Sequence, residues 1–286
     1  MSNKILVTGA TGNVGSHIIR LLQDKGADFV AGVNSGTIED VASVSIEYTD
    51  VASLEKAMQG ISTLFMVLPD HPDVVRWGRN LIDTAKNAGV NHIVRSSGSL
   101  AKIDSSLMMV VLLSATDQDV KDSGIDYTIT APQFFMQNFI NYFADDYKNG
   151  AICQPAGDGK IGWVDLRDVA AVNVEVLLNP EKYKNQTLTI TGSENLSYPE
   201  AVSQMNEVLG KESQYIAVSD ETAIEAMKDL RYSPFMIDLI ISLNHAIVKG
   251  YAEEVTEMVE SVTGKKPIAF KQFITDNKDV WSNGQT

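Results

Sequence analysis

The chain has 286 residues, of which 44% are hydrophobic and 21% charged, and its formal net charge is −14. This composition indicates a folded globular protein, and the negative charge disfavours nucleic acid or an anionic membrane as the main partner. A single cysteine, Cys153, excludes an internal disulfide and fits a reducing compartment. No apolar run approaches the ~20 residues of a membrane-spanning helix, and no signal-peptide pattern opens the chain, so we expect a soluble, cytoplasmic protein.

The first half of the sequence alternates strand patterns with helix patterns. Short apolar and β-branched runs predict strands at 5–8, 29–33, 43–48, 64–68, 92–96 and 127–130. Apolar residues at helical spacing predict helices at 14–22, 54–58, 74–88 and 110–121. Strands that alternate with helices indicate an α/β fold with a parallel sheet and right-handed crossovers.

After Pro132 the pattern becomes less regular. It predicts an aromatic-rich helix at 134–147, a turn cluster at 155–159, a helix at 169–178 capped by Asp168, a strand at 187–191, a helix from the Ser197 cap to Leu209, and mostly helical structure over 221–262. No internal repeat and no long linker separates these segments from the first half. We therefore expect a second lobe that is interleaved with the sheet.

A glycine-rich turn follows the first predicted strand directly. Gly9, Gly12 and Gly15 are spaced at three and lead into the first predicted helix, which is the context of a dinucleotide-binding turn. The first glycine permits the tight turn, the second lets backbone amides approach a pyrophosphate, and the third lets the helix pack closely on the strand. We predict a doubly wound Rossmann sheet in a dinucleotide-binding domain over residues 1–150, and a smaller, mostly helical, substrate-side lobe over residues 151–286.

Further cofactor contacts are expected at the carboxyl ends of the strands, where open α/β sheets bind ligands. The second strand ends without an acidic residue, so a 2′-phosphate is not repelled there, and Asn34, Ser35 and Thr37 can donate hydrogen bonds to it. This favours NADP, with NAD as the alternative. Asp50, at the end of the third strand, can accept a hydrogen bond from the adenine amino group or cap the next helix. The predicted set is Gly9, Thr11, Gly12, Asn13, Val14, Gly15, Asn34, Ser35, Asp50, Val51, Val67, Leu68, Pro69, Ser96 and Ser97.

Five segments together form a recognisable pattern: Thr8–Gly15, Tyr48–Asp50, Gly124–Phe139, Pro155–Asp168, and Val262–Pro267 followed by Phe270 and Phe273. They resemble the NmrA-like family of atypical short-chain dehydrogenases/reductases. The resemblance implies an NAD(P)-binding protein, since such relatives include quinone, azo and triphenylmethane-dye reductases and also redox-sensing regulators that bind NADP without turnover. The chain departs from many relatives by lacking Arg at Asn34 and Ala131, and by lacking a basic side chain over 113–117.

The sequence lacks the catalytic pair of ordinary short-chain dehydrogenases, a tyrosine followed four residues later by a lysine that lowers its pKa. None of the nine tyrosines has lysine at that offset. We therefore predict hydride transfer to a small conjugated acceptor of the quinone, azo, dye, enone or imine type, whose product needs no strong acid. A non-enzymatic NAD(P) sensor that acts on a partner protein is the alternative, and an epimerase or isomerase is a third reading.

Residues for this chemistry are expected where the strands end and where aromatic side chains gather. No histidine pair has metal-ligand spacing, so we expect no metal. The protein is expected to act on a small molecule as a monomer or homodimer. The catalytic candidates are Ser97, Gln133 and Tyr127, and the substrate-side candidates are Gln133, Phe134, Phe135, Asn138 and Trp163.

Overall fold

The computed structural model describes residues 4–282. The chain divides into two compact units, each built from three stretches of sequence. Unit 1 comprises Met1–Lys102, Val111–Ala131 and Val169–Thr189, and unit 2 comprises Ile103–Val110, Pro132–Asp168 and Ile190–Thr286. Within residues 4–282, no helix is both long and apolar enough to cross a membrane.

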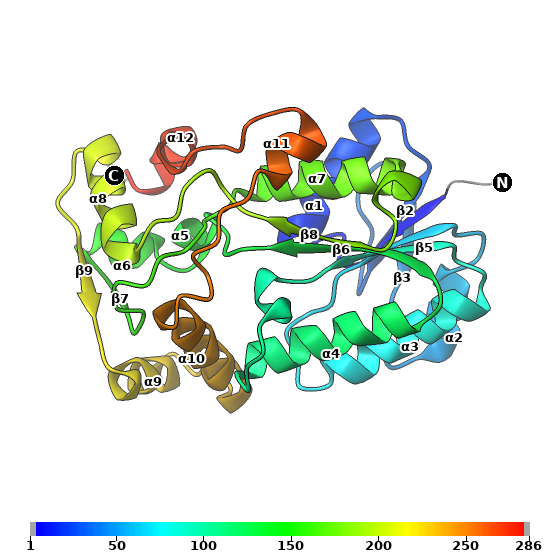
Figure 1. Ribbon diagram of the computed structural model, residues 1–286, viewed down its shortest axis with the longest axis horizontal. Helices are drawn as coiled ribbons and strands as arrows, with labels where there is room; N and C mark the ends of the chain where they lie inside the picture. The colour runs from blue at the N-terminus through cyan, green and yellow to red at the C-terminus, as the bar shows by residue number, and fades with distance from the viewer. Residues whose placement is uncertain (1–3, 283–286) are drawn as a thin grey trace. The chain divides into compact units, whose positions relative to one another are not determined.

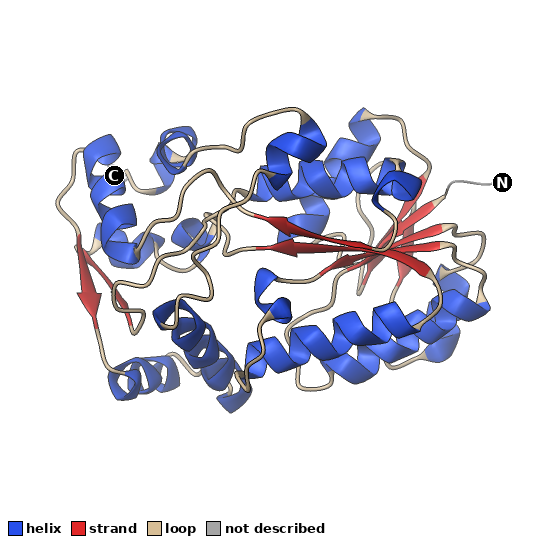
Figure 2. Cartoon of the chain, viewed as in Figure 1, coloured by secondary structure: helices blue, strands red, loops and turns tan. Residues whose placement is uncertain are grey.

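Unit 1 contains a seven-stranded sheet in the order β3-β2-β1-β4-β5-β6-β8, shown as arrows in Figure 2. Neighbouring strands from β3 to β6 pair in parallel. Strand order reverses between β1 and β4, which is the topological switch point where doubly wound sheets bind ligands. The strands are β1 (Ile5–Val7), β2 (Phe29–Val33), β3 (Ser43–Ser45), β4 (Thr63–Met66), β5 (His92–Ser96), β6 (Asp126–Pro132) and β8 (Gln186–Ile190).

Helices cover both faces of this sheet (Figure 1), which confirms the predicted doubly wound α/β fold. α1 (Asn13–Asp24) and α7 (Leu166–Leu178) lie on one face, and α2 (Val51–Ala57), α3 (Val74–Asn87) and α4 (Met108–Asp122) lie on the other. The α1 sequence places buried side chains at helical spacing, as its apolar pattern predicted. Short 3₁₀ helices occur at Ser99–Lys102 and Pro180–Tyr183.

Unit 2 is mostly helical and has an aromatic core. Phe139 lies at its centre, with its ring centroid 5.0 Å from that of Trp163 and 5.1 Å from that of Phe270. Two short parallel strands, β7 (Ala151–Gln154) and β9 (Gln214–Ala217), also belong to this unit. Its helices are α5 (Asn138–Asn141), α6 (Ala144–Lys148), α8 (Tyr198–Leu209), α9 (Asp220–Asp229), α10 (Pro234–Val248), α11 (Met258–Thr263) and α12 (Phe270–Asp276), followed by a 3₁₀ turn at Lys278–Val280.

The predicted boundaries hold best where a cap residue marks them. Ser197 caps α8 through a capping box with Glu200, and Gly210 ends that helix with φ 64°. The prediction of Asp168 as a helix cap was wrong, because α7 already begins at Leu166 and Asp168 lies in its first turn. The strands β7 and β9 were not predicted.

The single helix predicted at 134–147 was also wrong. Phe135 forms a β-bridge with Val164, and the Met136 amide donates to the Val164 carbonyl at 2.9 Å. These pairings hold the start of the segment extended, so helix begins only at Asn138 and breaks before α6. The helix-like spacing of the aromatic residues reflects their burial in one core and not one continuous helix.

Candidate functional site

The turn between β1 and α1 exposes three residues at the start of the helix, and within it the Gly12 amide donates to the Gly9 carbonyl at 2.9 Å. Thr11, Gly12 and Asn13 are exposed. Gly12 precedes α1 without a side-chain cap, and the first turn of α1 contains no acidic residue. The amides that a cap would otherwise satisfy therefore remain available at the positive end of the helix dipole. Such an N-terminus favours an anionic group.

Close backbone packing explains the three glycines of this turn. Gly9 has φ +60°, and an added Cβ would lie 2.5 Å from Val67 Cγ1. A Cβ on Gly15 would lie only 2.1 Å from the Gly9 carbonyl oxygen, so a larger residue would push α1 away from β1. At Gly12 the added atom would meet Gly9 O at 3.2 Å on an otherwise exposed surface. The turn thus forms a cradle that fits a pyrophosphate and that side chains would fill.

The other residues predicted to contact a cofactor in unit 1 follow the ends of β2, β3 and β4. Asn34 and Ser35 are exposed in the bend after β2. Asp50 caps α2 by accepting from the Ala52 amide at 3.0 Å, so one of its two expected roles is present. The next residue, Val51, is 49% exposed. Val67 and Leu68 are half-buried and Pro69 is exposed, while Val14 is buried in the core under α1.

A buried polar cluster lies at the carboxyl end of β5. Ser97 Oγ donates to Asp117 Oδ2 at 2.8 Å. Arg95 Nε lies 3.6 Å from the other carboxylate oxygen, Oδ1, and the two charged side chains are only 4% and 7% exposed. The Arg95 guanidinium also donates to the backbone carbonyl of Ser96. Unit 1 therefore holds an enclosed ion pair directly beneath a predicted cofactor residue.

Burial and the neighbouring charge shift the pKa of Asp117 in opposite directions. Burial raises the pKa of Asp117, while Arg95 and the Ser97 hydroxyl counteract part of that rise. Ser97 is among the residues predicted from the sequence, whereas Arg95 and Asp117 are not. One signal was available: an arginine within a buried strand requires an acidic partner.

Tyr127, one of the catalytic candidates, lies at the wrong end of its strand. It is the second residue of β6 and pairs with Ile93, the second residue of β5. Ser97 follows the opposite, carboxyl end of β5, and its amide donates to the Thr130 carbonyl at 2.8 Å. Parallel strands bring their carboxyl ends to one edge, so Tyr127 faces the other edge and is removed from the candidate site.

The substrate-side candidates lie in unit 2 and differ in exposure. Phe134, Phe135 and Asn138 are half-buried. Trp163 is 1% exposed and donates from Nε1 to the Leu196 carbonyl, so it contributes to the aromatic core. Gln133 is 4% exposed, and its Oε1 has no hydrogen-bond partner within the described residues. Gln133 is therefore the candidate whose polar group the fold leaves unused.

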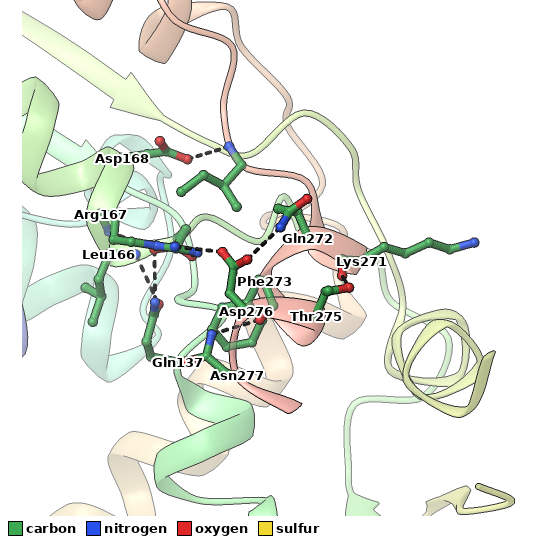
Figure 3. A network of polar contacts seen from close by, with 12 residues as sticks. Gln137, Leu166, Arg167, Asp168, Lys271, Gln272, Phe273, Thr275, Asp276 and Asn277 are labelled. Atoms are coloured by element: carbon green, nitrogen blue, oxygen red, sulfur yellow. Dashed lines mark hydrogen bonds and ion pairs between the residues drawn. The ribbon is translucent and has the colours of Figure 1, made fainter. Parts of the chain in front are cut away.

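A polar network in unit 2 connects the start of α7 with the C-terminal helix α12 (Figure 3). Asp165 is fully buried and accepts from Gln137 Nε2 at 3.0 Å and from Arg167 Nη2 at 2.8 Å. Arg167 Nη1 in turn donates to Asp276 at 2.7 Å. Asp168 accepts from the Ile268 amide at 2.7 Å. The Arg167–Asp276 and Asp168–Ile268 contacts join residues 109 and 100 positions apart in the sequence.

The sheet topology and the glycine cradle define a Rossmann-type α/β protein. The model of the NmrA-like family matches residues 1–273, and the chain belongs to that family. It is 33% identical over 275 residues to an NAD(P)H azoreductase of Xenophilus azovorans, covering 94% of this chain and 96% of that protein. It is 26% identical over 263 residues to quinone oxidoreductase 2 of Escherichia coli, covering 86% of this chain and 88% of that protein.

Solved structures show the same fold. An Escherichia coli NADPH-dependent quinone oxidoreductase in complex with NADPH has a TM-score of 0.87 and 22% identity, over 96% of this chain and 99% of that one. A triphenylmethane reductase of Citrobacter sp. has a TM-score of 0.86 and 24% identity, over 98% of this chain and 100% of that one. The family and the fold class expected from the sequence are thus confirmed.

Proposed function

We propose that the protein is an NAD(P)H-dependent reductase that delivers a hydride to a small conjugated acceptor. The observation that carries this proposal is the glycine cradle at the switch point of the sheet, where α1 begins at exposed residues without a side-chain cap. Full-length similarity to a protein named as an NAD(P)H azoreductase supports the redox assignment. The acceptor would be a quinone, azo compound, dye, enone or imine.

The residues of unit 1 suit NADP, with NAD as the alternative. The cradle would hold the pyrophosphate through backbone amides and the α1 dipole. Asn34 and Ser35, exposed after β2, would donate hydrogen bonds to a 2′-phosphate. No arginine stands in the bend at 34–37, so a bidentate charge-assisted contact from it is missing, and we expect only a modest preference for NADPH over NADH.

The protein's contribution to the reaction is mainly positional. When bound, the reduced nicotinamide supplies the hydride. The side chains hold and orient two planar reactants, which converts an encounter between two molecules into a step within one complex. Without a Tyr-Lys pair, water completes protonation of a product that is already delocalised or readily protonated. Gln133 and the half-buried Phe134, Phe135 and Asn138 are proposed for the substrate side.

The test is oxidation of NADPH and of NADH by the purified protein against a panel of quinones, azo dyes, triphenylmethane dyes, enones and imines. We expect one acceptor class to be turned over well above background. At equal, low cofactor concentration, the rate should be higher with NADPH than with NADH. Tight cofactor binding without turnover across the panel would instead identify a sensor. Absence of binding of either cofactor would refute the proposal.

The setting proposed for this activity is cytoplasmic. The acidic chain has one cysteine and a net charge of −14, which suits a reducing compartment and a small-molecule substrate better than nucleic acid or an anionic membrane. We propose a monomer or homodimer, which the mass of the purified protein in solution would test.

A further inference from the structure

The Ser97 hydroxyl has one proton, and the structure shows where it goes. Ser97 Oγ donates it to Asp117 Oδ2 at 2.8 Å. A serine hydroxyl has one donor and two acceptor positions, so any further hydrogen bond at Oγ must be donated by the other group. Ser97 is half-buried, and it follows the carboxyl end of β5. It therefore offers an acceptor at the edge of the sheet where ligands bind.

Asp117 lies between Ser97 and a buried cation, so its carboxylate is placed to accept the Ser97 proton. Its second oxygen faces Arg95 Nε at 3.6 Å in an enclosed ion pair. Arg95 is fixed through its own hydrogen bond to the Ser96 carbonyl, and the Arg95 carbonyl accepts from Thr130 Oγ1 at 3.3 Å. A guanidinium has no acceptor, so the Asp117 carboxylate lies between a cation at ion-pair distance, Arg95, and its hydrogen-bond donor, Ser97.

We propose that Asp117 is a positioning residue that commits Ser97 Oγ to accept a hydrogen bond from the nicotinamide half of the cofactor, with Arg95 fixing Asp117. The donor on the cofactor is a ribose hydroxyl or the carboxamide NH₂. This inference rests on the proposed cofactor. It assigns roles to two buried side chains that the proposed hydride transfer does not otherwise use.

The order of the strands selects the nicotinamide half. The cradle that would hold the pyrophosphate follows β1, and the bend with Asn34 follows β2 on one side of it. β4 and β5 lie on the other side of β1. A dinucleotide that crosses the switch point with its adenosine over β2 places its second nucleoside over β4 and β5. Ser97 stands at the end of β5, on that second half.

The variant Asp117→Asn tests the inference because it should reverse the polarity at Ser97. Arg95 has no acceptor, so the new amide must turn its oxygen to Arg95 and its NH₂ to Ser97. Ser97 then accepts from the amide, and its proton turns toward the ligand, where it meets another donor. Asp119→Asn is the matched control: Asp119 lies on the same helix α4 and pairs with Arg79 at 2.8 Å on the surface of unit 1.

Binding is measured by calorimetry with three ligands. For NADPH we expect Asp117→Asn to weaken affinity by about tenfold or more, the size expected when two buried donors face each other. Adenosine 2′,5′-bisphosphate lacks the nicotinamide half, and its affinity should stay within about twofold, as expected where no contact changes. Equal weakening of 2′-phospho-ADP-ribose would identify the ribose hydroxyl as the donor, and sparing of that ligand would identify the carboxamide.

Two further variants separate positioning from a merely structural effect. Ser97→Ala leaves the ion pair in place and should weaken NADPH while sparing adenosine 2′,5′-bisphosphate. In the Ser97→Ala background, Asp117→Asn should then cause no additional loss, because its effect passes through Ser97. If Asp117→Asn folded poorly, the Ser97→Ala comparison between NADPH and adenosine 2′,5′-bisphosphate would still test the hydrogen bond at Ser97.

Other outcomes overturn the inference. Equal weakening of NADPH and adenosine 2′,5′-bisphosphate would show a structural role, and unchanged NADPH affinity would show no role. A change confined to the KM of the acceptor would mean that Ser97 faces the substrate. Failure of the unmodified protein to bind any of the three ligands would refute the proposed cofactor site itself, an outcome distinct from the others.

Discussion

The two units use their polar groups in opposite ways. In unit 1, Thr11, Gly12 and Asn13 are exposed, and α1 begins without a side-chain cap or an acidic residue in its first turn. In unit 2, fully buried Asp165 is surrounded by donors that connect distant segments of the chain. The cradle of unit 1 thus leaves an uncapped helix start at the surface, whereas the Asp165 network of unit 2 uses its polar groups to hold segments of that unit together. Substitutions at these groups should change binding in unit 1 and stability in unit 2.

The largest expected effect is on cofactor binding, from Gly12→Asp in the cradle. A carboxylate there adds bulk and a charge of the same sign as the pyrophosphate. We expect NADPH affinity to fall by about a hundredfold or more, as when two or more hydrogen bonds to a charged group are lost. Calorimetry on a variant with native circular dichroism measures this.

Gly12→Ala is the control for bulk alone, because its Cβ would meet Gly9 O at a tolerable 3.2 Å. It should cost less affinity than the charged variant. Unchanged NADPH binding by Gly12→Asp would show that the cradle is not the phosphate site. The contrast drawn between the two units would then be wrong.

The next effect is on stability, from Asp165→Ala in unit 2. The substitution removes the acceptor of Gln137 and of Arg167, and it leaves their donors partly buried. Because Arg167 is 40% exposed and water can reach it, we expect a loss of about 2–4 kcal/mol in the free energy of unfolding, toward the lower end of buried-pair losses. Urea titration followed by circular dichroism gives this value.

Asp145→Ala is the matched control in the same unit. Asp145 pairs with Lys148 at 2.6 Å, but its side chain is 85% exposed. An exposed pair of this kind contributes less than about 1 kcal/mol. Equal losses from the two substitutions would show that the buried network contributes no special stability.

A smaller effect concerns pH and Asp168. Burial raises the pKa of Asp168 to about 6, with nearby Asp165 adding to the rise and the Ile268 amide and Arg167 opposing it. The folded state therefore favours the protonated carboxyl, and its contribution to stability is lost as pH rises from about 4 through about 6. Relative to Asp168→Asn, the wild type should lose about 1–3 kcal/mol between pH 4 and pH 7. Parallel pH curves for the two proteins would contradict this.

The smallest expected effect is that of Tyr127→Phe on turnover. Tyr127 pairs with the second residue of β5, far from the edge that carries the cradle. With a quinone as acceptor, kcat should change by less than about tenfold, whereas loss of a general acid costs ~100- to 10,000-fold. A thousandfold loss in kcat with intact cofactor binding would place a catalytic tyrosine in the protein after all.

The sequence predicts unit 1 better than unit 2 for a physical reason. Strand and helix periods, and the glycines of the cradle, are local signals that need no knowledge of what packs against them. The Arg95–Asp117 pair depends on which face of α4 meets β5, and neither segment shows this by itself. In unit 2 the bridge between Phe135 and Val164 overrides a helical pattern. The features that the sequence did not predict thus depend on contacts between distant segments, which local patterns do not show.

The division of the chain also limits how such a protein can diversify. Its path passes between the units five times, at 102–103, 110–111, 131–132, 168–169 and 189–190. No single cut releases either unit as one continuous stretch, so neither can be exchanged by joining gene segments end to end. Point substitutions and loop insertions, by contrast, can alter either unit without breaking this shared frame.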